Sequence, residues 1–346
     1  MGGRRAAAVA ALLALALAPC AGAQAGPEPL GPFELREELL LAQRRLSLPA
    51  RGPATLARGA SSLRLDLDWG SDFAVEPNRY LLDGEHRSFA LTLEHGVRDR
   101  LTLGLRVPIE WRGGGELDGP IDWFHRVTGL PNGGRPRYSQ DRLIVRALDP
   151  DGVPVEWQGG AGTGLGRVEL SALFALARGE PRRRRLSLAA RVALPTGGGA
   201  FPADAVSTAA GAQLLASTAL GERFDLYAGA GAAADGCVLE GLDYERVRGF
   251  AFVALEWRPF RRYAFLAQSD WGSRLSSGIW DYPGAQSYLR LGLKRRLGER
   301  WVLDLGFSEG LVSQQSTTDF GVFAGVSLSL GGAASHPPDP PLAPPK

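Results

Sequence analysis

A two-residue alternation of apolar and polar side chains recurs along most of this 346-residue chain, and it limits the fold more than any other feature. Between Leu101 and Arg112, apolar residues occupy the odd positions, and mainly polar or small residues occupy the even ones. The same period is found at 63–69, 186–194, 289–294 and 301–307. A period of two is typical of β-strands with two unlike faces. After the first 23 residues there is no apolar run of about 18, which a transmembrane helix requires.

A soluble sandwich alternates too, but three features favour a membrane barrel. One strand face carries Gly, Ser, Thr and charged residues, while the opposite face is aliphatic and aromatic, as expected when lipid surrounds the outside. Tight charged turns, such as 98–100 and 298–300, alternate with longer loops rich in Gly, Pro and Asp. Aromatic residues flank the apolar bands, as in interfacial girdles: Trp111, Phe224, Trp257, Tyr263 and Trp301. These features predict an all-β fold, an antiparallel transmembrane β-barrel.

The strand count with this parity is about twelve, which places both chain ends in the periplasm. The predicted strands are 62–74, 80–97, 101–112, 164–177, 186–195, 207–220, 224–232, 247–258, 263–271, 285–297, 301–309 and 320–330. Fourteen strands is the alternative, if 142–148 and 153–157 belong to the wall. We interpret these two instead as a hairpin in the connection before the fourth strand. The 46 Gly residues then have a reason, because small inward residues make room for charged ones in a narrow barrel.

The N-terminus has the pattern of a cleaved export signal. Arg4 and Arg5 precede an apolar run over 6–18, and Ala21-Gly22-Ala23 fits a cleavage site, so residues 1–23 are predicted to be removed. Acylation at Cys20 is the alternative, which Pro19 disfavours. The signal, together with the barrel pattern, predicts location in the cell outer membrane.

The segments that flank the barrel, 24–61 and 331–346, lack the strand pattern. Residues 24–61 are predicted to be a periplasmic leader with a short helix over 32–46, since Leu35, Leu39, Ala42 and Leu46 share one helical stripe. The alternative is that this segment covers a pore from the periplasmic side. Residues 331–346 are Pro-rich and are predicted to form a disordered tail.

The connection over 113–163 is predicted to be a long extracellular loop with a short helix. Asp118 or Asp122 is suited to cap this helix, which would run through Trp123, Phe124 and His125 and end at Gly129 and Pro131. The Trp and Phe side chains need burial. We therefore expect the loop to fold into the barrel mouth as a partial lid.

Short motifs in and around this loop occur in a fixed order. They are Asp83-Gly84-Glu85, Pro108, Leu117-Asp118-Gly119, Phe124-His125, Gly129-Leu130-Pro131-Asn132-Gly133-Gly134-Arg135, Gly164-Leu165-Gly166 and Pro195-Thr196-Gly197. In this order the chain resembles a family of Gram-negative outer-membrane β-barrel proteins catalogued only as a domain of unknown function. The resemblance is dense over 80–197 and implies a barrel without an assigned activity. Arg167 departs from the family pattern, which usually has Asp there, and the last strand lacks the terminal aromatic that the barrel-assembly machinery commonly reads.

Charged residues on the inward faces must find partners in a confined lumen. The lumen-facing charges are predicted to be Arg64, Asp66, Glu94, Arg106, Glu110, Arg112, Glu169, Arg191, Arg290 and Asp304. They form either a structural ladder of ion pairs or a surface that selects a small solute. At the outer rim, we single out Asp83, Glu85 and His86, and in the loop Asp118, Asp122, Trp123, Phe124, His125 and Arg135.

Evidence for catalysis or a cofactor is weak. The four His residues show no metal-site spacing, so no metal, cofactor or catalytic residue is predicted, although His125 with Asp118 and Asp122 offers cation ligands. A rim hydrolase would use His86 beside Asp83 and Glu85, but the sequence does not favour an enzyme.

The sequence predicts a channel or transporter-like protein for a small solute, with a hydrophobic or an anionic solute as the leading candidates. The alternative is a structural or interaction barrel whose loops bind a partner. Expected partners are outer-membrane lipid, lipopolysaccharide and the barrel-assembly machinery. The formal net charge of +2 argues against nucleic-acid binding.

Overall fold

The structure analysed is a computed structural model. It describes residues 28–129, 134–157, 161–177, 184–197, 207–236, 244–279, 284–310 and 318–331. The predicted signal peptide and, apart from Gly331, the predicted Pro-rich tail lie outside these ranges.

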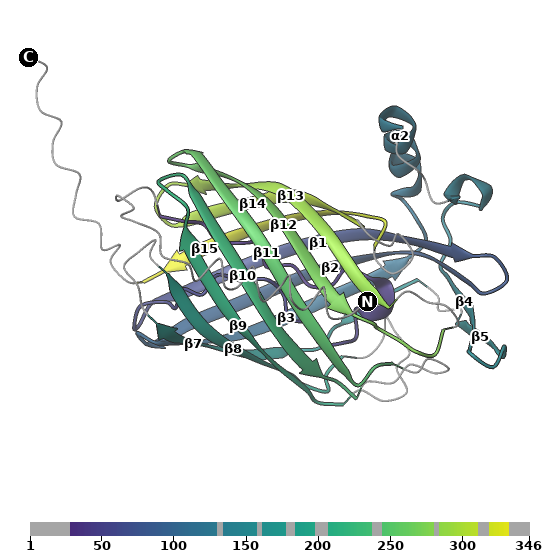
Figure 1. Ribbon diagram of the computed structural model, residues 1–346, viewed down its shortest axis with the longest axis horizontal. Coiled ribbons are helices and arrows are strands. Elements are labelled where there is room, and N and C mark those ends of the chain that lie inside the picture. The colour runs from purple at the N-terminus through teal and green to yellow at the C-terminus, as the bar shows by residue number, and fades with distance from the viewer. Residues whose placement is uncertain are drawn as a thin grey trace, which may run out of the picture.

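Twelve antiparallel strands form a closed barrel, as the alternation predicts (Figure 1). Each strand pairs with the next along the wall, and the first pairs with the last, so the sheet has no free edge there. The wall strands are β1 (Ser61–Glu76), β2 (Tyr80–Arg98), β3 (Leu101–Gly113), β7 (Glu169–Ala177), β8 (Arg185–Ala193), β9 (Ala209–Ala219), β10 (Phe224–Ala234), β11 (Val247–Phe260), β12 (Tyr263–Ser273), β13 (Ala285–Leu297), β14 (Trp301–Gly310) and β15 (Phe320–Leu330).

Three short strands lie outside this ring of twelve. β4 (Ile144–Leu148) and β5 (Pro154–Trp157) form the predicted hairpin, and β4 pairs with the far end of β2. The fourteen-strand alternative is therefore wrong. β6 (Gly162–Leu165) and β7 both pair with β3, so the predicted strand 164–177 is interrupted between them.

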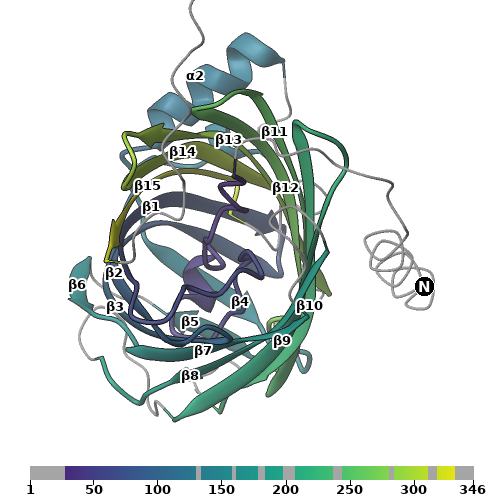
Figure 2. The same ribbon diagram turned by 90° about the vertical axis from the view of Figure 1, so that its left-hand side faces the viewer.

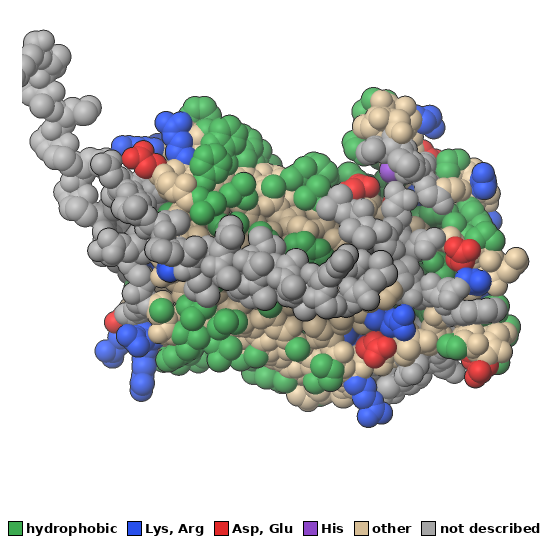
Figure 3. Space-filling view, in the orientation of Figure 1, with side chains coloured by type: hydrophobic (Ala, Val, Ile, Leu, Met, Phe, Trp, Pro, Cys, Tyr) green, Lys and Arg blue, Asp and Glu red, His purple; other side chains and the backbone are tan. Residues whose placement is uncertain are grey.

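The two faces of the wall have opposite chemistry. On β3, Leu103 and Ile109 are 45% and 47% exposed on the outside, while Arg106 and Glu110 are buried on the inside. Figure 3 shows hydrophobic side chains spread over the wall and charged ones mainly near its two ends. This apolar-out arrangement is that of a transmembrane β-barrel. Among the described helices, none has the length and apolar content to cross a membrane.

Residues 28–60, which we call the luminal segment, run through the barrel, and their last part, 57–59, is exposed at the barrel end (Figure 2). Most side chains from Pro32 to Arg51 are buried, and the only helical turn in the described part of this segment is η1 (Leu40–Ala42). The predicted helix over 32–46 and the predicted position as a periplasmic leader are therefore wrong. The wall supplies the partners that a helix would supply itself, because Gln268 and Asp235 accept hydrogen bonds from the backbone N–H groups of Phe33 and Leu46 at 2.8 and 2.7 Å.

The luminal segment enters and leaves at the barrel end that carries the tight turns. Thr55 Oγ1 donates to the carbonyl of Asp99 in the β2–β3 turn at 2.9 Å. In the opposite half, the Tyr244 hydroxyl donates to the carbonyl of Leu41 at 2.8 Å. The segment therefore rises through the lumen, turns near η1 and returns to begin β1.

Candidate functional site: the occupied lumen

All ten predicted lumen-facing charges lie on the inner side of the wall. Some of them pair with each other, as a structural ladder would: Arg64 contacts Asp304 at 2.8 Å and Asp66 at 2.6 Å. Lys294, which the prediction did not include, also contacts Asp304 at 3.2 Å. Arg191 contacts Glu169 at 2.5 Å. The Lys294–Asp304 and Arg191–Glu169 pairs join neighbouring strands, and the Arg64–Asp304 pair reaches from β1 past β15 to β14.

Other lumen charges pair with the luminal segment instead. Arg36 bridges Glu110 and Glu169, each at 3.3 Å, and Arg51 contacts Glu94 at 2.8 Å. Sequence reasoning missed this role of the segment because it looked for partners only among wall residues. The apolar stripe over 32–46 is compatible with a helix, but it is equally compatible with an irregular segment that fills the lumen. The pattern therefore does not distinguish these two conformations.

The tightest of these contacts is a two-pronged ion pair between Glu37 and Arg248. The two guanidinium Nη atoms of Arg248 donate to the two carboxylate oxygens of Glu37 at 2.6 and 2.8 Å. Arg248 is only 2% exposed and also donates to the carbonyl of Ser273 and to Gln286. Paired planar groups of this kind fix geometry as well as charge.

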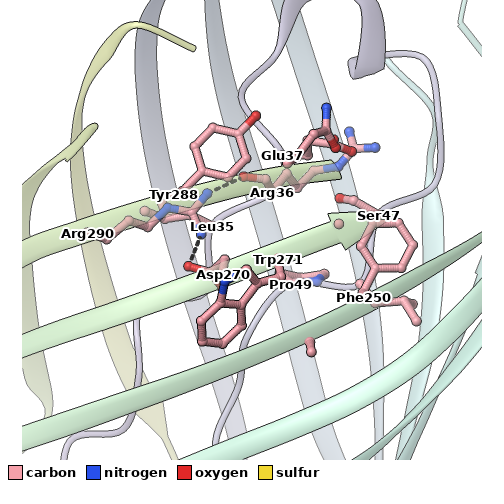
Figure 4. Close-up of a pocket in the computed structure, with 14 residues that line it drawn as sticks. Leu35, Arg36, Glu37, Ser47, Pro49, Phe250, Asp270, Trp271, Tyr288 and Arg290 are labelled. Carbon is pink, nitrogen blue, oxygen red and sulfur yellow. Dashed lines mark hydrogen bonds and ion pairs between the residues drawn. The ribbon is translucent and has the colours of Figure 1, made fainter. Parts of the chain in front are cut away.

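Arg290 holds the middle of the luminal segment from β13. Its Nη1 contacts Asp270 at 2.7 Å, and its Nη2 donates to the carbonyl of Arg36 at 2.8 Å (Figure 4). Glu38 lies 4.0 Å from Arg290 and accepts a hydrogen bond from Ser308. A single wall arginine thus fixes both the backbone and a carboxylate of the segment.

Arg167 and Asp235 hold the returning part of the luminal segment. Their side chains pair at 2.6 Å, and the Asp235 carboxylate also accepts the Leu46 N–H. Arg167 further donates to the carbonyl of Arg44 at 3.0 Å. The departure at position 167 from the family pattern therefore places a cation where the segment presents backbone carbonyls.

Small wall residues accommodate the apolar side chains of the segment. Phe33 and Leu35 pack against Ala264, Leu266 and Phe323. At Gly292, a Cβ would lie 2.2 Å from the carbonyl oxygen of Leu305 and 3.0 Å from the Phe33 ring, so any side chain would collide there. Gly292 therefore makes room for the segment, while Gly325 makes room for the charged side chains of Arg64 and Asp66, as predicted.

Little open space is left between the segment and the wall. Three of the remaining cavities have volumes of about 30, 200 and 20 Å³. The largest of these three lies at the entry end, and its lining includes Glu34, Arg51, Glu94 and Tyr227. The described residues thus show a lumen that is filled along most of its length.

The three predicted rim residues do not form one group. Strand alternation places His86 on the inner face of β2, while Asp83 and Glu85 lie on the outer face. Glu85 accepts hydrogen bonds from Trp69 Nε1 at 2.9 Å and from the backbone of Leu117. His86 is 2% exposed and lines a small cavity closed by the luminal segment. His86 is therefore not paired with Asp83 or Glu85, the arrangement that a rim hydrolase would use.

The loop helix α2 (Asp118–Thr128) exists and ends at Gly129, whose φ of 74° suits glycine, as predicted. The predicted cap is wrong, because Asp118 lies in the first turn and pairs with Arg135. Asp122 lies on the same buried face and accepts from Gln140 at 3.1 Å.

The expected burial of Trp123 in the barrel mouth is also wrong. Trp123 is 60% exposed, and the Phe124 ring lies 5.9 Å from Phe320, which in turn stacks on the outward-facing Phe307 of β14. The helix therefore leans on the outside of the rim rather than over the mouth (Figure 2). The reason is that its polar face, not its apolar face, packs against the charged rim.

Asp304 offers a test of the inner ladder. It is fully buried between Arg64 and Lys294, so Asp304→Ala leaves two buried cations without this partner. We expect unfolding to become easier by about 3–5 kcal/mol, the usual effect of breaking a buried pair. Urea unfolding in lipid vesicles measures the free energy of unfolding. Asp99→Ala, in an exposed turn, is the control. Equal stability of the two variants would show that the ladder does not support the wall.

The arrangement of the wall resembles that of known outer-membrane channels. The COG4313 outer membrane channel from Pseudomonas putida F1 matches with a TM-score of 0.54 and 12% identity, covering 80% of this chain and 97% of that one. The Pseudomonas putida toluene transporter TodX matches with a TM-score of 0.39 and 13% identity, over 80% and 91% of the two chains. The NanC porin matches with a TM-score of 0.43 and 7% identity, over 78% and 100%. The first of these similarities supports the barrel fold.

Sequence comparison supplies the family. No curated protein sequence matches the chain. A family model described as "Protein of unknown function (DUF3187)" matches residues 11–329, which include the whole wall except the last residue of β15. The chain therefore belongs to this family, in agreement with the resemblance seen in its loop motifs.

Proposed function

We propose that this protein is an outer-membrane channel for a small polar solute and that the luminal segment is its gate. The observation that carries the proposal is that residues 28–60 fill a charged lumen without joining the sheet. The inner wall presents charges of both signs, which suits a polar solute better than a hydrophobic one.

The contacts of the segment are of a kind that water can replace. Beside the apolar packing of Phe33 and Leu35, they are ion pairs and hydrogen bonds, such as those of Arg36 and Arg51, rather than a continuous ladder of backbone pairing. Buried ion pairs gain little net energy because desolvation opposes them. When the segment leaves, water entering the lumen solvates both sets of charges. The segment can thus move out while the wall, closed by its own hydrogen bonds, stays intact.

The direction of opening follows from the chain connections. The segment is attached to β1 at the end with tight turns, which in outer-membrane barrels faces the periplasm. Gly59, with a φ of 79°, lies at this attachment and offers a hinge. A periplasmic force or partner is therefore best placed to withdraw the segment. We also propose that residues 1–23 are a cleaved export signal and that the barrel-assembly machinery inserts the protein into the outer membrane.

The competing function is a sealed structural barrel whose loops bind a partner. Under that function the luminal segment is a permanent part of the fold, and its removal yields an unfolded or still closed protein. Planar-bilayer conductance of the intact chain and of a segment-deleted chain distinguishes the two functions.

We also propose that α2 contacts lipid of the outer leaflet. Trp123 and Val127, one helical turn apart, are 60% and 66% exposed and continue the aromatic line of Phe124, Phe320 and Phe307. Because that line runs down the lipid-facing wall, we place this stripe in the interface of the outer leaflet, against lipopolysaccharide or phospholipid.

Quenching by brominated lipids tests this placement. In vesicles with bromine near the headgroups, Trp123→Tyr should remove a quenched part of the tryptophan emission. Trp257 lies in the aromatic girdle at the other end of the barrel. Trp257→Tyr is therefore the control, which shows how much quenching is lost when a tryptophan at the membrane interface is removed. If aqueous iodide, and not brominated lipid, quenches Trp123, the helix lies in water and the placement is wrong.

A further inference from the structure

We propose that His125, Glu309 and Asp319 form a site for one divalent transition-metal ion that fastens α2 to the outside of the wall. The three residues come from α2, from the end of β14 and from the residue before β15. Each offers one ligand atom, and these atoms lie within 4.8 Å of one another. This inference does not depend on the proposed gate.

The site is built by packing rather than by chance exposure. His125 and Asp319 are 3% and 4% exposed, and Glu309 is partly buried beneath the helix. Ligands bound to one zinc ion at about 2.1 Å lie about 3.5 Å apart, so shifts of about 1 Å would complete the site. Such shifts need only small side-chain rotations.

The charges around the site are not balanced by the protein alone. Arg135 is paired with both Asp118 and Asp319, the latter at 3.1 Å, so one cation serves two carboxylates. Glu309 adds a third, and none of the described residues donates a hydrogen bond to it or forms an ion pair with it. Metal binding requires a neutral imidazole and ionised carboxylates; in that state three carboxylates and one guanidinium leave an excess of two negative charges, which one divalent ion neutralises.

The donor set indicates the class of metal. One imidazole nitrogen with two carboxylate oxygens suits zinc or manganese better than calcium or magnesium, which prefer oxygen alone. The set differs from the one the sequence offered, His125 with Asp118 and Asp122. Asp118 is occupied by Arg135, and the topology brings Glu309 and Asp319 to the imidazole instead.

Zinc titration of the metal-stripped full-length protein tests the proposal. Calorimetry in detergent, on protein without a histidine tag, should show one Zn²⁺ per chain that excess Mg²⁺ does not displace. His125→Ala and Glu309→Gln should each weaken binding by about 100-fold or more, a larger loss than removal of an outer-shell partner causes. His95→Ala, at the tight-turn end of β2, is the matched control and should bind as the unchanged protein does.

Proteolysis supplies a second readout that does not depend on affinity. Arg126 and Arg137 are exposed sites for trypsin, and Zn²⁺ should slow cleavage at both in the unchanged protein but not in Glu309→Gln. Heat-modifiable electrophoretic migration shows that each variant is a folded barrel. Absence of zinc binding in the unchanged protein, or a site variant that binds zinc as tightly as the unchanged protein, would overturn the proposal.

Discussion

Deletion of residues 28–53 should turn a closed barrel into a conducting one. In planar bilayers, we expect the mean current to rise by about tenfold or more, because barrels larger than eight strands enclose more space than wall side chains alone fill. The deletion keeps 54–60, which lead into β1, and all twelve wall strands. The wall carboxylates that lose their partners, including Glu110 and Glu169, then face water, which solvates them at little cost.

The matched control is deletion of 116–138, which removes α2. Because α2 leans on the outside of the rim, its loss should leave the current unchanged. A current that rises only in this second variant would mean that the loop is a lid after all. An intact chain that already conducts as well as the segment-deleted one would show that the luminal segment is no gate.

The wall could be predicted from sequence because its signal is local. Alternation along β3 or β13 indicates which strand face meets lipid. The tight turns indicate which consecutive strands are neighbours in the sheet. The boundaries move by only a few residues, as at β1, predicted over 62–74 and found over Ser61–Glu76. The interruption between β6 and β7 was missed, since Arg167 leaves the wall to meet Asp235, a partner distant in sequence.

The filling of the lumen could not be predicted in the same way. Leu35, Leu39, Ala42 and Leu46 share a helical stripe, but they are buried on several sides by different wall strands. What decides their conformation is the set of polar groups on the wall, such as Gln268 accepting the Phe33 N–H. No local pattern records such partners, because they lie from 32 positions away, as Asp72 does from Leu40, to 235 positions away, as Gln268 does from Phe33.

In the loop over 113–163, too, the local pattern predicts the secondary structure but not the position of the helix. The end of α2 at Gly129 follows from local glycine chemistry and was predicted. Its placement was not, because burial of Asp118, Asp122 and His125 depends on Arg135 and the charged rim. An apolar residue such as Trp123 needs no protein cover when lipid is the outer solvent.

Reversing one charge of the Glu37–Arg248 pair should open the channel without deleting the segment. Arg248→Glu places a carboxylate against Glu37 in a site where the guanidinium is 2% exposed. Breaking a buried pair in this way costs about 3–5 kcal/mol, enough to shift the segment towards its withdrawn state. We expect frequent openings in bilayer recordings, where the unchanged protein stays closed.

The double variant Glu37→Arg with Arg248→Glu separates a gate from a general loss of packing. It restores opposite charges across the same contact, so most closed time should return, although the hydrogen bonds of Arg248 to the Ser273 and Arg274 carbonyls remain lost. Reversal at the Arg87–Glu116 pair, which lies outside the lumen with Glu116 exposed and Arg87 partly buried, is the control and should leave the recordings unchanged. If the double variant opens as often as Arg248→Glu alone, the ion pair does not hold the segment, and the openings come from a general loss of packing around position 248. If the control opens as well, the effect is one of barrel stability and not of gating.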